Sequence, residues 1–140
     1  MTSERVVVWF NDTHGSGNQF LRDIWPKLSP LLSNAAAFVM VAVALAREAR
    51  ARFQKVLPDA LLIPGEDART AADVLTGEEL RCAQEIGLML DAKSPLGYGG
   101  TALLVAYYFQ CPNNSLPLLW KQQDEGYPWN RLFAYHPKPS

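Results

Sequence analysis

The residues with the clearest chemical potential stand in the stretch VVVWFNDTHGSGNQF, residues 6–20. An apolar run ends there at Asn11 and Asp12 and continues into a loop with two glycines. A carboxylate such as that of Asp12 can accept hydrogen bonds from sugar hydroxyls or hold a magnesium-bound water. Glycines let a backbone approach a ligand closely, and the N–H groups that begin a helix favour phosphate. The stretch therefore predicts either a sugar-phosphate site or an ordinary strand-to-helix turn.

Two common nucleotide motifs are excluded for this loop. The motif GxxxxGK[ST] needs a lysine that the loop lacks, and GxGxxG fails because Phe20 stands at its last position. His14, the histidine beside the loop, is a candidate general base, although a catalytic role is the less favoured interpretation. Of the nearby arginines, Arg47 stands closest to a strand end and could clamp a phosphate. The favoured interpretation for all three residues, Arg47, Arg50 and Arg52, is a solvated helix face.

Apolar runs alternate with helical patterns along the chain, and these elements must position the loop. Runs rich in β-branched and aromatic residues predict buried strands at 5–10, 36–44, 60–65 and 101–109. Helical spacing predicts short helical pieces over 18–32, a helix over 45–57, and a helix capped by Thr76 and Glu79. Near-continuous apolar strands separated by helices indicate an α/β fold. We expect a doubly wound, mainly parallel sheet of about four strands with flanking helices.

Length and composition are those of one globular domain. The chain has 140 residues, of which 49% are hydrophobic and 19% charged, and its net charge is −1. This predicts a single domain over 1–140, with an irregular Pro- and aromatic-rich tail over 121–140. The small, evenly spread charge gives no basic footprint for nucleic acid. Cys82 and Cys111 form no CxxC pair and predict reduced thiols.

No segment of the sequence has the pattern of a membrane span or a signal peptide. The longest apolar run, residues 35–46, is shorter than the roughly 20 residues that a span needs. The first residues are polar and of mixed charge, unlike a signal region. The sequence therefore predicts a soluble, cytoplasmic protein.

A second cluster of polar residues, CPNN at 111–114, follows the last expected strand. If strands 6–10 and 101–109 are parallel, their carboxyl ends open on one edge of the sheet, and Asn113 and Asn114 face the glycine loop. Their amides could then contact a base or a ribose. The alternative, which is somewhat favoured, is a turn stabilised by the asparagine side chains. Trp120 fits the core better than a stacking platform.

The stretch 6–20 resembles the phosphoribosyl pyrophosphate loop of type I phosphoribosyltransferases. In that family an apolar strand ends in two acidic residues, followed by two further residues and a loop of Thr, Gly and Ser. By resemblance, Asp12 matches the second acid, which holds the ribose hydroxyls, and Asn11 replaces the first. The resemblance implies Asp12 and Asn11 as catalytic positions and Asp12 as a ligand of a possible Mg²⁺. The implied ligand-binding residues in this loop are Thr13, Gly15, Ser16, Gly17, Asn18 and Gln19.

The stretch LGYGGTALLVAYYFQCPNNSLPLLW, residues 96–120, sharpens the resemblance. It is similar to the C-terminal signature of a phosphoribosyltransferase-like family associated with bacterial conflict and defence systems. There a Gly-Tyr-Gly turn leads into an apolar strand, then Pro-Asn-Asn and an apolar-Trp ending; Trp129 and Phe133 also fit. The two motifs frame residues 6–120 and match the C-terminal half of such a domain.

The resemblance implies that the chain binds phosphoribosyl pyrophosphate or a related ribose phosphate or nucleotide, as part of a transferase-like defence protein. The alternative is a degenerate domain without turnover that senses nucleotides or serves as an assembly module. In the full fold, strands upstream of the acid-bearing strand complete the sheet and supply the loop that grips pyrophosphate. We therefore expect the isolated chain to be inactive. We also expect it to form homo-oligomers or to bind a partner chain that completes the sheet.

Overall fold

The computed structural model describes residues 5–91, 93–107, 111–121 and 132–133. The chain divides into two compact units, Met1–Ala68 and Arg69–Ser140, which are described separately. Within the described parts of both units, no helix combines the length and the apolar character that a membrane crossing requires.

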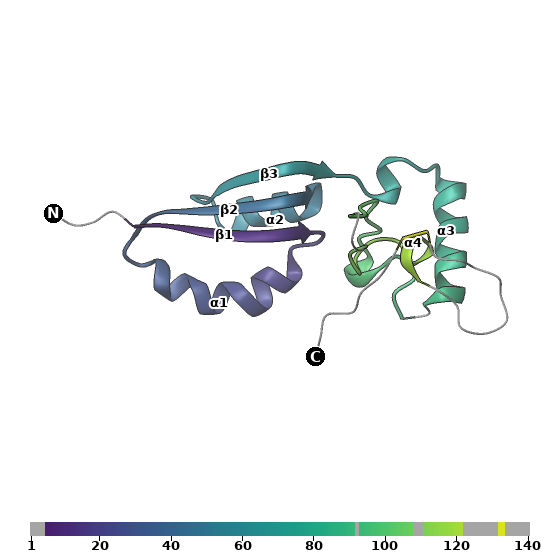
Figure 1. The fold of residues 1–140 in the computed structure, drawn as a ribbon, viewed down its shortest axis with the longest axis horizontal. Helices are drawn as coiled ribbons and strands as arrows, with labels where there is room; N and C mark the ends of the chain where they lie inside the picture. Colours follow the sequence, from purple (N-terminus) through teal and green to yellow (C-terminus); the bar gives the residue numbers. More distant parts are fainter. Residues whose placement is uncertain (1–4, 92, 108–110, 122–131, 134–140) are drawn as a thin grey trace. The chain divides into compact units, whose positions relative to one another are not determined.

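The first unit is built on a three-stranded parallel sheet, whose arrows all point the same way in Figure 1. The strands are β1 (Arg5–His14), β2 (Ala35–Ala46) and β3 (Leu61–Ala68), in the order β1-β2-β3. The predicted parallel α/β sheet is therefore confirmed, with three strands instead of about four. Because β2 lies between the other two, β1 is an edge strand among the described residues. The register aligns Val8 with Val39 and Val39 with Leu61.

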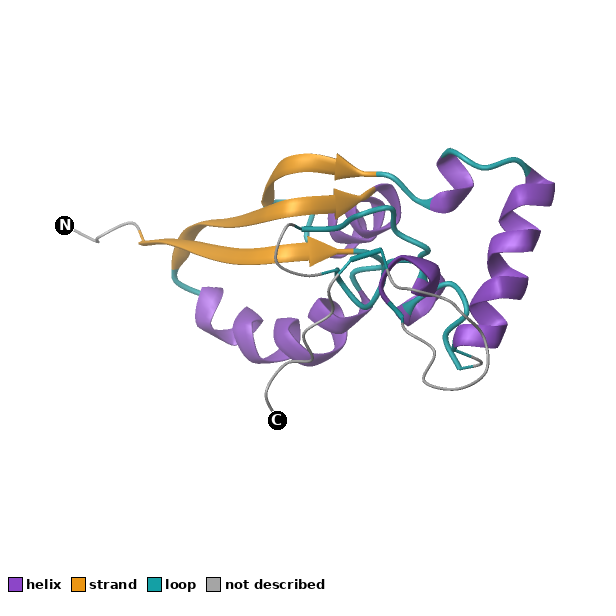
Figure 2. Cartoon of the chain, turned by 45° about the vertical axis from the view of Figure 1, so that its right-hand side comes forward, coloured by secondary structure: helices purple, strands orange, loops and turns teal. Residues whose placement is uncertain are grey.

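Helical segments connect the strands (Figure 2). The chain is helical from residue 18 to residue 32, in three short pieces: the π-helix η1 (Phe20–Ile24), the α-helix α1 (Trp25–Leu28) and the 3-10 helix η2 (Ser29–Leu32). A proline stands in the first turn of both α1 and η2, where its missing N–H costs no hydrogen bond. The prediction of short helical pieces is confirmed. Helix α2 (Arg47–Val56) begins directly after β2.

Both connections pack on the same face of the sheet. Phe20, which begins η1, and Phe53 of α2 are buried there against strand residues such as Trp9 and Met40. The rings of Phe20 and Phe53 meet edge to face, with centroids 5.5 Å apart. Two right-handed crossovers that step in one direction along a sheet place their helices on one face. The expected doubly wound arrangement, with helices on both faces, is therefore not what this unit shows.

The opposite face of the sheet is apolar and exposed. Because side chains alternate along a strand, every second residue of β1, β2 and β3 points to it. The side chains with the largest exposure on this face are Val6, Val8 and Phe10 from β1, Val43 from β2, and Leu61 and Ile63 from β3.

The second unit contains helix α3 (Gly77–Leu90) and short helical turns. Thr76 and Glu79 form the predicted capping box: the Glu79 amide donates to Thr76 Oγ1 at 3.4 Å and the Thr76 amide to the Glu79 carboxylate at 2.8 Å. A second capping box, which the sequence analysis did not identify, joins Thr70 and Asp73 at the 3-10 turn η3 (Ala71–Asp73). The remaining turns are η4 (Tyr98–Gly100) and α4 (Pro117–Trp120).

The predicted strand 101–109 is wrong for its described part, residues 101–107. Ala102 has φ +48°, which lies outside the strand region of backbone conformation. The backbone amides of this segment bond to scattered partners: Leu103 to the Asn114 carbonyl at 3.1 Å and Leu104 to the Arg69 carbonyl at 2.9 Å. Because these partners do not belong to one neighbouring strand, no regular ladder of β-sheet hydrogen bonds forms. Three consecutive residues of this segment, Thr101, Ala102 and Leu103, are buried instead.

A smaller prediction for the second unit, a core position for Trp120, is confirmed. Trp120 is buried, and its indole N–H donates to the Ser115 carbonyl at 3.1 Å, which makes it a core residue. Cys82 is exposed, Cys111 is buried, and both thiols are free. Most of the predicted irregular tail, including Trp129, lies outside the described residues.

Candidate functional site

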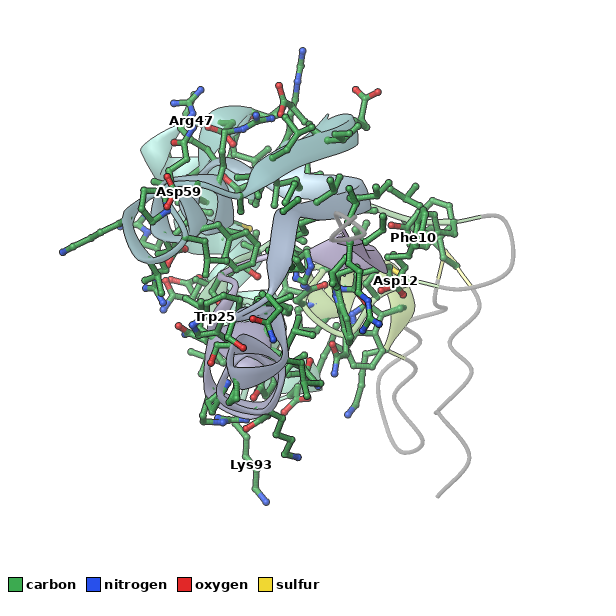
Figure 3. All side chains as sticks on the ribbon, turned by 90° about the vertical axis from the view of Figure 1, so that its left-hand side faces the viewer. Phe10, Asp12, Trp25, Arg47, Asp59 and Lys93 are labelled. Atoms are coloured by element: carbon green, nitrogen blue, oxygen red, sulfur yellow. The ribbon has the colours of Figure 1, made fainter. Side chains whose placement is uncertain are left out.

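The candidate site begins inside β1, because this strand continues through the Asn-Asp pair to His14. Successive side chains of a strand point to opposite faces. Asp12 is exposed on the same side of β1 as Phe10 (Figure 3), whereas Asn11 is half-buried on the helix-covered side. The Asp12 carboxylate accepts from the Thr13 amide at 2.8 Å, and the Asn11 amide donates to the Thr13 carbonyl at 3.0 Å. The pair therefore does not converge, and only Asp12 presents a charge at the surface.

The glycine loop lies directly against helix α2. Gly15, Ser16 and Gly17 are all buried, and Gly17 has φ +74°. A Cβ atom at Gly17 would lie 2.9 Å from Cε1 of Phe53 and 3.5 Å from the Cα of Ala49. Both the positive φ and the close approach require glycine at this position.

The helical segment begins at the end of this loop. The Leu21 amide donates to the Gly17 carbonyl at 3.1 Å, and the Asn18 amide donates to Ser16 Oγ at 3.3 Å. Asn18 and Gln19 are exposed. The first N–H groups of a helix have no partner within the helix and form a positive end of its dipole. The strand end, the tight glycine and the helix start thus have the order that the sequence predicted for a phosphate loop.

His14 is a packed residue beneath the loop. Its ring is buried against Phe20 and Phe53, with centroids 5.8 Å and 5.0 Å away. Burial lowers the pKa of His14 from 6.5 to about 4, while the nearby charge of Asp12 opposes part of that shift. The imidazole is therefore neutral near pH 7 and shielded from solvent. This placement favours a structural role over that of a general base.

One arginine of α2 reaches the loop, and it is not the one that the sequence favoured. The Arg52 guanidinium donates to Oδ1 of Asn18 and forms an ion pair with Glu48 at 2.7 Å. Arg50 pairs with Asp67 near the end of β3, and Arg47 is exposed. The spacing of Glu48 and Arg52 by four residues was visible in the sequence, but their proximity to Asn18 depends on how α2 packs.

The comparison with known families decides what kind of domain this is. A family model described as PRTase-CE matches residues 2–134. The chain belongs to the PRTase-CE family. It is therefore a phosphoribosyltransferase-like domain, as the two sequence motifs predicted. No curated protein and no solved structure matches the chain.

In the second unit of the PRTase-CE chain, the segment CPNN, residues 111–114, forms a turn that contains both asparagines. The Ser115 amide donates to the Pro112 carbonyl at 3.0 Å, which closes a turn with Asn113 and Asn114 at its centre. The Asn114 carbonyl accepts from the Thr101 hydroxyl at 3.1 Å. The predicted shared crevice with Asp12 required a strand at 101–109 beside β1, and the described residues form none there. The described residues of this segment thus form a turn that is closed by a backbone hydrogen bond.

Burial of the neutral His14 makes the stability of the PRTase-CE domain pH-dependent. Its pKa is lower in the folded than in the unfolded state, so stability is complete above about pH 6.5 and falls as the pH drops towards 4. We expect the free energy of unfolding to be ~2 kcal/mol lower at pH 5 than at pH 7.5 from this group. Urea denaturation of the wild type and His14→Gln measures it. An equal pH dependence in both proteins would contradict the prediction.

Proposed function

We propose that this PRTase-CE domain binds phosphoribosyl pyrophosphate, or a related ribose phosphate or nucleotide, at the loop of residues 15–19. The observation that carries the proposal is the close approach of the Gly17 backbone to helix α2, at the point between the end of the strand and the start of the helical segment. In the proposed complex, amides of the segment from Gly15 to Gln19, other than that of Asn18, which donates to Ser16 Oγ, donate to the 5′-phosphate, and Asp12 accepts from the ribose hydroxyls. In the cell the domain would belong to a cytoplasmic defence protein.

The residues present fit one type of magnesium site. Among the described residues, no group of three His, Cys, Asp or Glu side chains is arranged to hold a metal ion. Magnesium is often held by one or two carboxylates together with substrate phosphates and water. Asp12 supplies one exposed carboxylate, and Asn11 supplies none. We therefore propose that Mg²⁺ enters with a diphosphate-bearing ligand, with Asp12 as the protein's contribution.

The binding proposal is tested by calorimetric titration of the purified chain with ribose 5-phosphate, and with ribose as the matched neutral ligand. We expect saturable heat with ribose 5-phosphate and much weaker binding of ribose, because the phosphate contributes charge-assisted hydrogen bonds. Equal binding of the two ligands, or no heat with either, would refute the proposed site.

A second candidate is a nucleotide-sensing or assembly domain without turnover, and Asn11 favours it. At the position of the first acid, the neutral Asn11 amide is engaged with the Thr13 carbonyl on the helix-covered side of β1. A transferase must stabilise the charge that grows on departing pyrophosphate, and a missing contact of this kind costs about 10²–10³ in rate. Release of pyrophosphate from phosphoribosyl pyrophosphate separates the two candidates. Asp12-dependent release would favour the transferase.

We also propose that a second α/β segment, from a partner chain or another copy, completes the sheet at β1. In the described part of the first unit, β1 pairs only with β2, and its outward apolar side chains Val6, Val8 and Phe10 are exposed. A strand added parallel at the free edge and followed by a right-handed crossover that steps away from β1 carries its helix on the face opposite α1 and α2. Such a partner would cover the apolar face and would also form hydrogen bonds with the open edge of β1.

Without this partner, the isolated chain is expected to self-associate through the same surface. Sedimentation at micromolar concentration should show dimers or larger species, and Phe10→Glu should shift them towards monomer. Leu31→Glu is the matched control, since Leu31 is 74% exposed and Phe10 72% exposed, but Leu31 lies in η2. A stable wild-type monomer would contradict the prediction, as would an equal effect of the two substitutions.

A further inference from the structure

Arg52 of helix α2 contacts the side chain of Asn18 at the end of the loop. Its guanidinium donates to Asn18 Oδ1, and its Nη2 atom lies 2.7 Å from the Glu48 carboxylate. We propose that Arg52 is a positioning residue that turns the Asn18 amide group so that its NH₂ donates to the phosphate of a bound ligand. This inference rests on the proposed function of the loop and names a residue outside it.

The hydrogen-bonding capacity of the two side chains supports this orientation. A guanidinium has five N–H donors and no acceptor, so only the oxygen of an amide can face it. With its oxygen bound by Arg52, Asn18 directs its two N–H donors away from α2. Asn18 is exposed at the beginning of the helical segment, where the backbone N–H groups also favour an anion. Arg52 thus makes Asn18 a donor at the place where the phosphate is expected.

The position of Arg52 is itself determined by its surroundings. Glu48 precedes Arg52 by four residues on the same helix, the spacing at which opposite charges pair. Ala49 and Phe53 of α2 are fully buried, and Gly17 lies against both of them. The separation between α2 and the loop is therefore set by close packing. The ion pair with Glu48 and this packing together bring the Arg52 guanidinium to Asn18.

The test compares three variants by titration with ribose 5-phosphate. Arg52→Lys keeps a residue that only donates, and we expect its affinity to stay within about threefold of the wild type. Arg52→Gln and Arg52→Ala should bind about tenfold more weakly, the usual effect of one misplaced hydrogen-bond donor. Arg50→Ala is the matched control, because it removes an arginine ion pair of the same helix with Asp67 of β3 and not with the loop. It should bind as the wild type does.

Asn18→Asp tests independently whether this side chain faces the phosphate. The carboxylate would still accept from Arg52, but it would offer the phosphate no donor and would repel its negative charge, so we expect binding at least about tenfold weaker than in Asn18→Ala. Wild-type affinity in Arg52→Ala and Arg52→Gln, while the wild type binds ribose 5-phosphate, would overturn this inference and leave the proposed function intact. If the wild type itself does not bind, both fall. Thermal unfolding midpoints equal to that of Arg50→Ala would show that the variants remain folded.

Discussion

Replacing Gly17 with valine is expected to weaken the binding of ribose 5-phosphate by about 100-fold or more. The residue has φ +74°, which a β-branched side chain adopts only under strain, and its Cβ atom would lie 2.9 Å from the Phe53 ring. The loop must therefore move off α2, and the amides from Gly15 to Gln19 move with it. Each charge-assisted hydrogen bond lost to the phosphate costs about 1.5–3 kcal/mol, so two such losses suffice for this effect.

The loss is measured by calorimetric titration, with circular dichroism to confirm that the variant is folded. Gly77→Val is the matched control, because nothing lies within 4 Å of a Cβ atom at Gly77, in the first turn of α3. Inorganic phosphate is a useful second ligand. Gly17→Val should lose both ligands, whereas Asp12→Ala should weaken ribose 5-phosphate alone, because Asp12 is assigned to the hydroxyls. Full affinity in Gly17→Val would rule out the loop as the phosphate site.

Replacing Phe53 with alanine is expected to lower the free energy of unfolding of the first unit by about 3–5 kcal/mol. Phe53 is fully buried and meets the rings of His14 and Phe20 edge to face, at 5.0 Å and 5.5 Å. Its removal leaves a cavity beneath the glycine loop, because the Phe53 ring also lies 2.9 Å from the position of a Cβ atom at Gly17. The same substitution should therefore loosen the loop and weaken ligand binding.

Urea denaturation followed by tryptophan fluorescence measures this loss, since Trp9 and Trp25 both pack in the same core as Phe53. Val56→Ala is the control on the same helix; Val56 is exposed, so the change should stay within about 0.5 kcal/mol. Phe53→Leu should fall between the two, because it keeps most of the buried apolar volume. A Phe53→Ala protein as stable as Val56→Ala would show that this core does not support the loop.

The loop at the end of the first strand was predictable because its signals are local. An apolar run, an acid, two glycines and a helical pattern follow one another between residues 6 and 32, and backbone propensity decides each of them. The capping box of Thr76 and Glu79 was predictable from the sequence for the same reason, since both hydrogen bonds form within one helical turn. The parallel sheet followed from apolar strands that alternate with helices.

Burial patterns that depend on distant neighbours were not predictable in this way. Residues 101–107 were predicted to form a strand because they are apolar. A buried apolar run, however, has no hydrophobic periodicity that would distinguish a strand from an irregular core segment. Their form depends on which backbone groups face them, and these belong to Leu96, Arg69 and Asn114. The same holds for the question of which face of the sheet the helices cover, because the answer depends on the direction in which the two crossovers move along the sheet.

The sequence by itself determined the order of strand, acid, glycine loop and helix, because each of these follows from a few neighbouring residues. It also determined membership of the PRTase-CE family, which matches residues 2–134. Only the tertiary structure decided that Asn11 and Asp12 point to opposite faces of a longer strand, that His14 is a core residue, and that Arg52 holds Asn18. The contact of Arg52 with Asn18 spans 34 positions of sequence, and packing between such distant segments leaves no periodic signal in the chain.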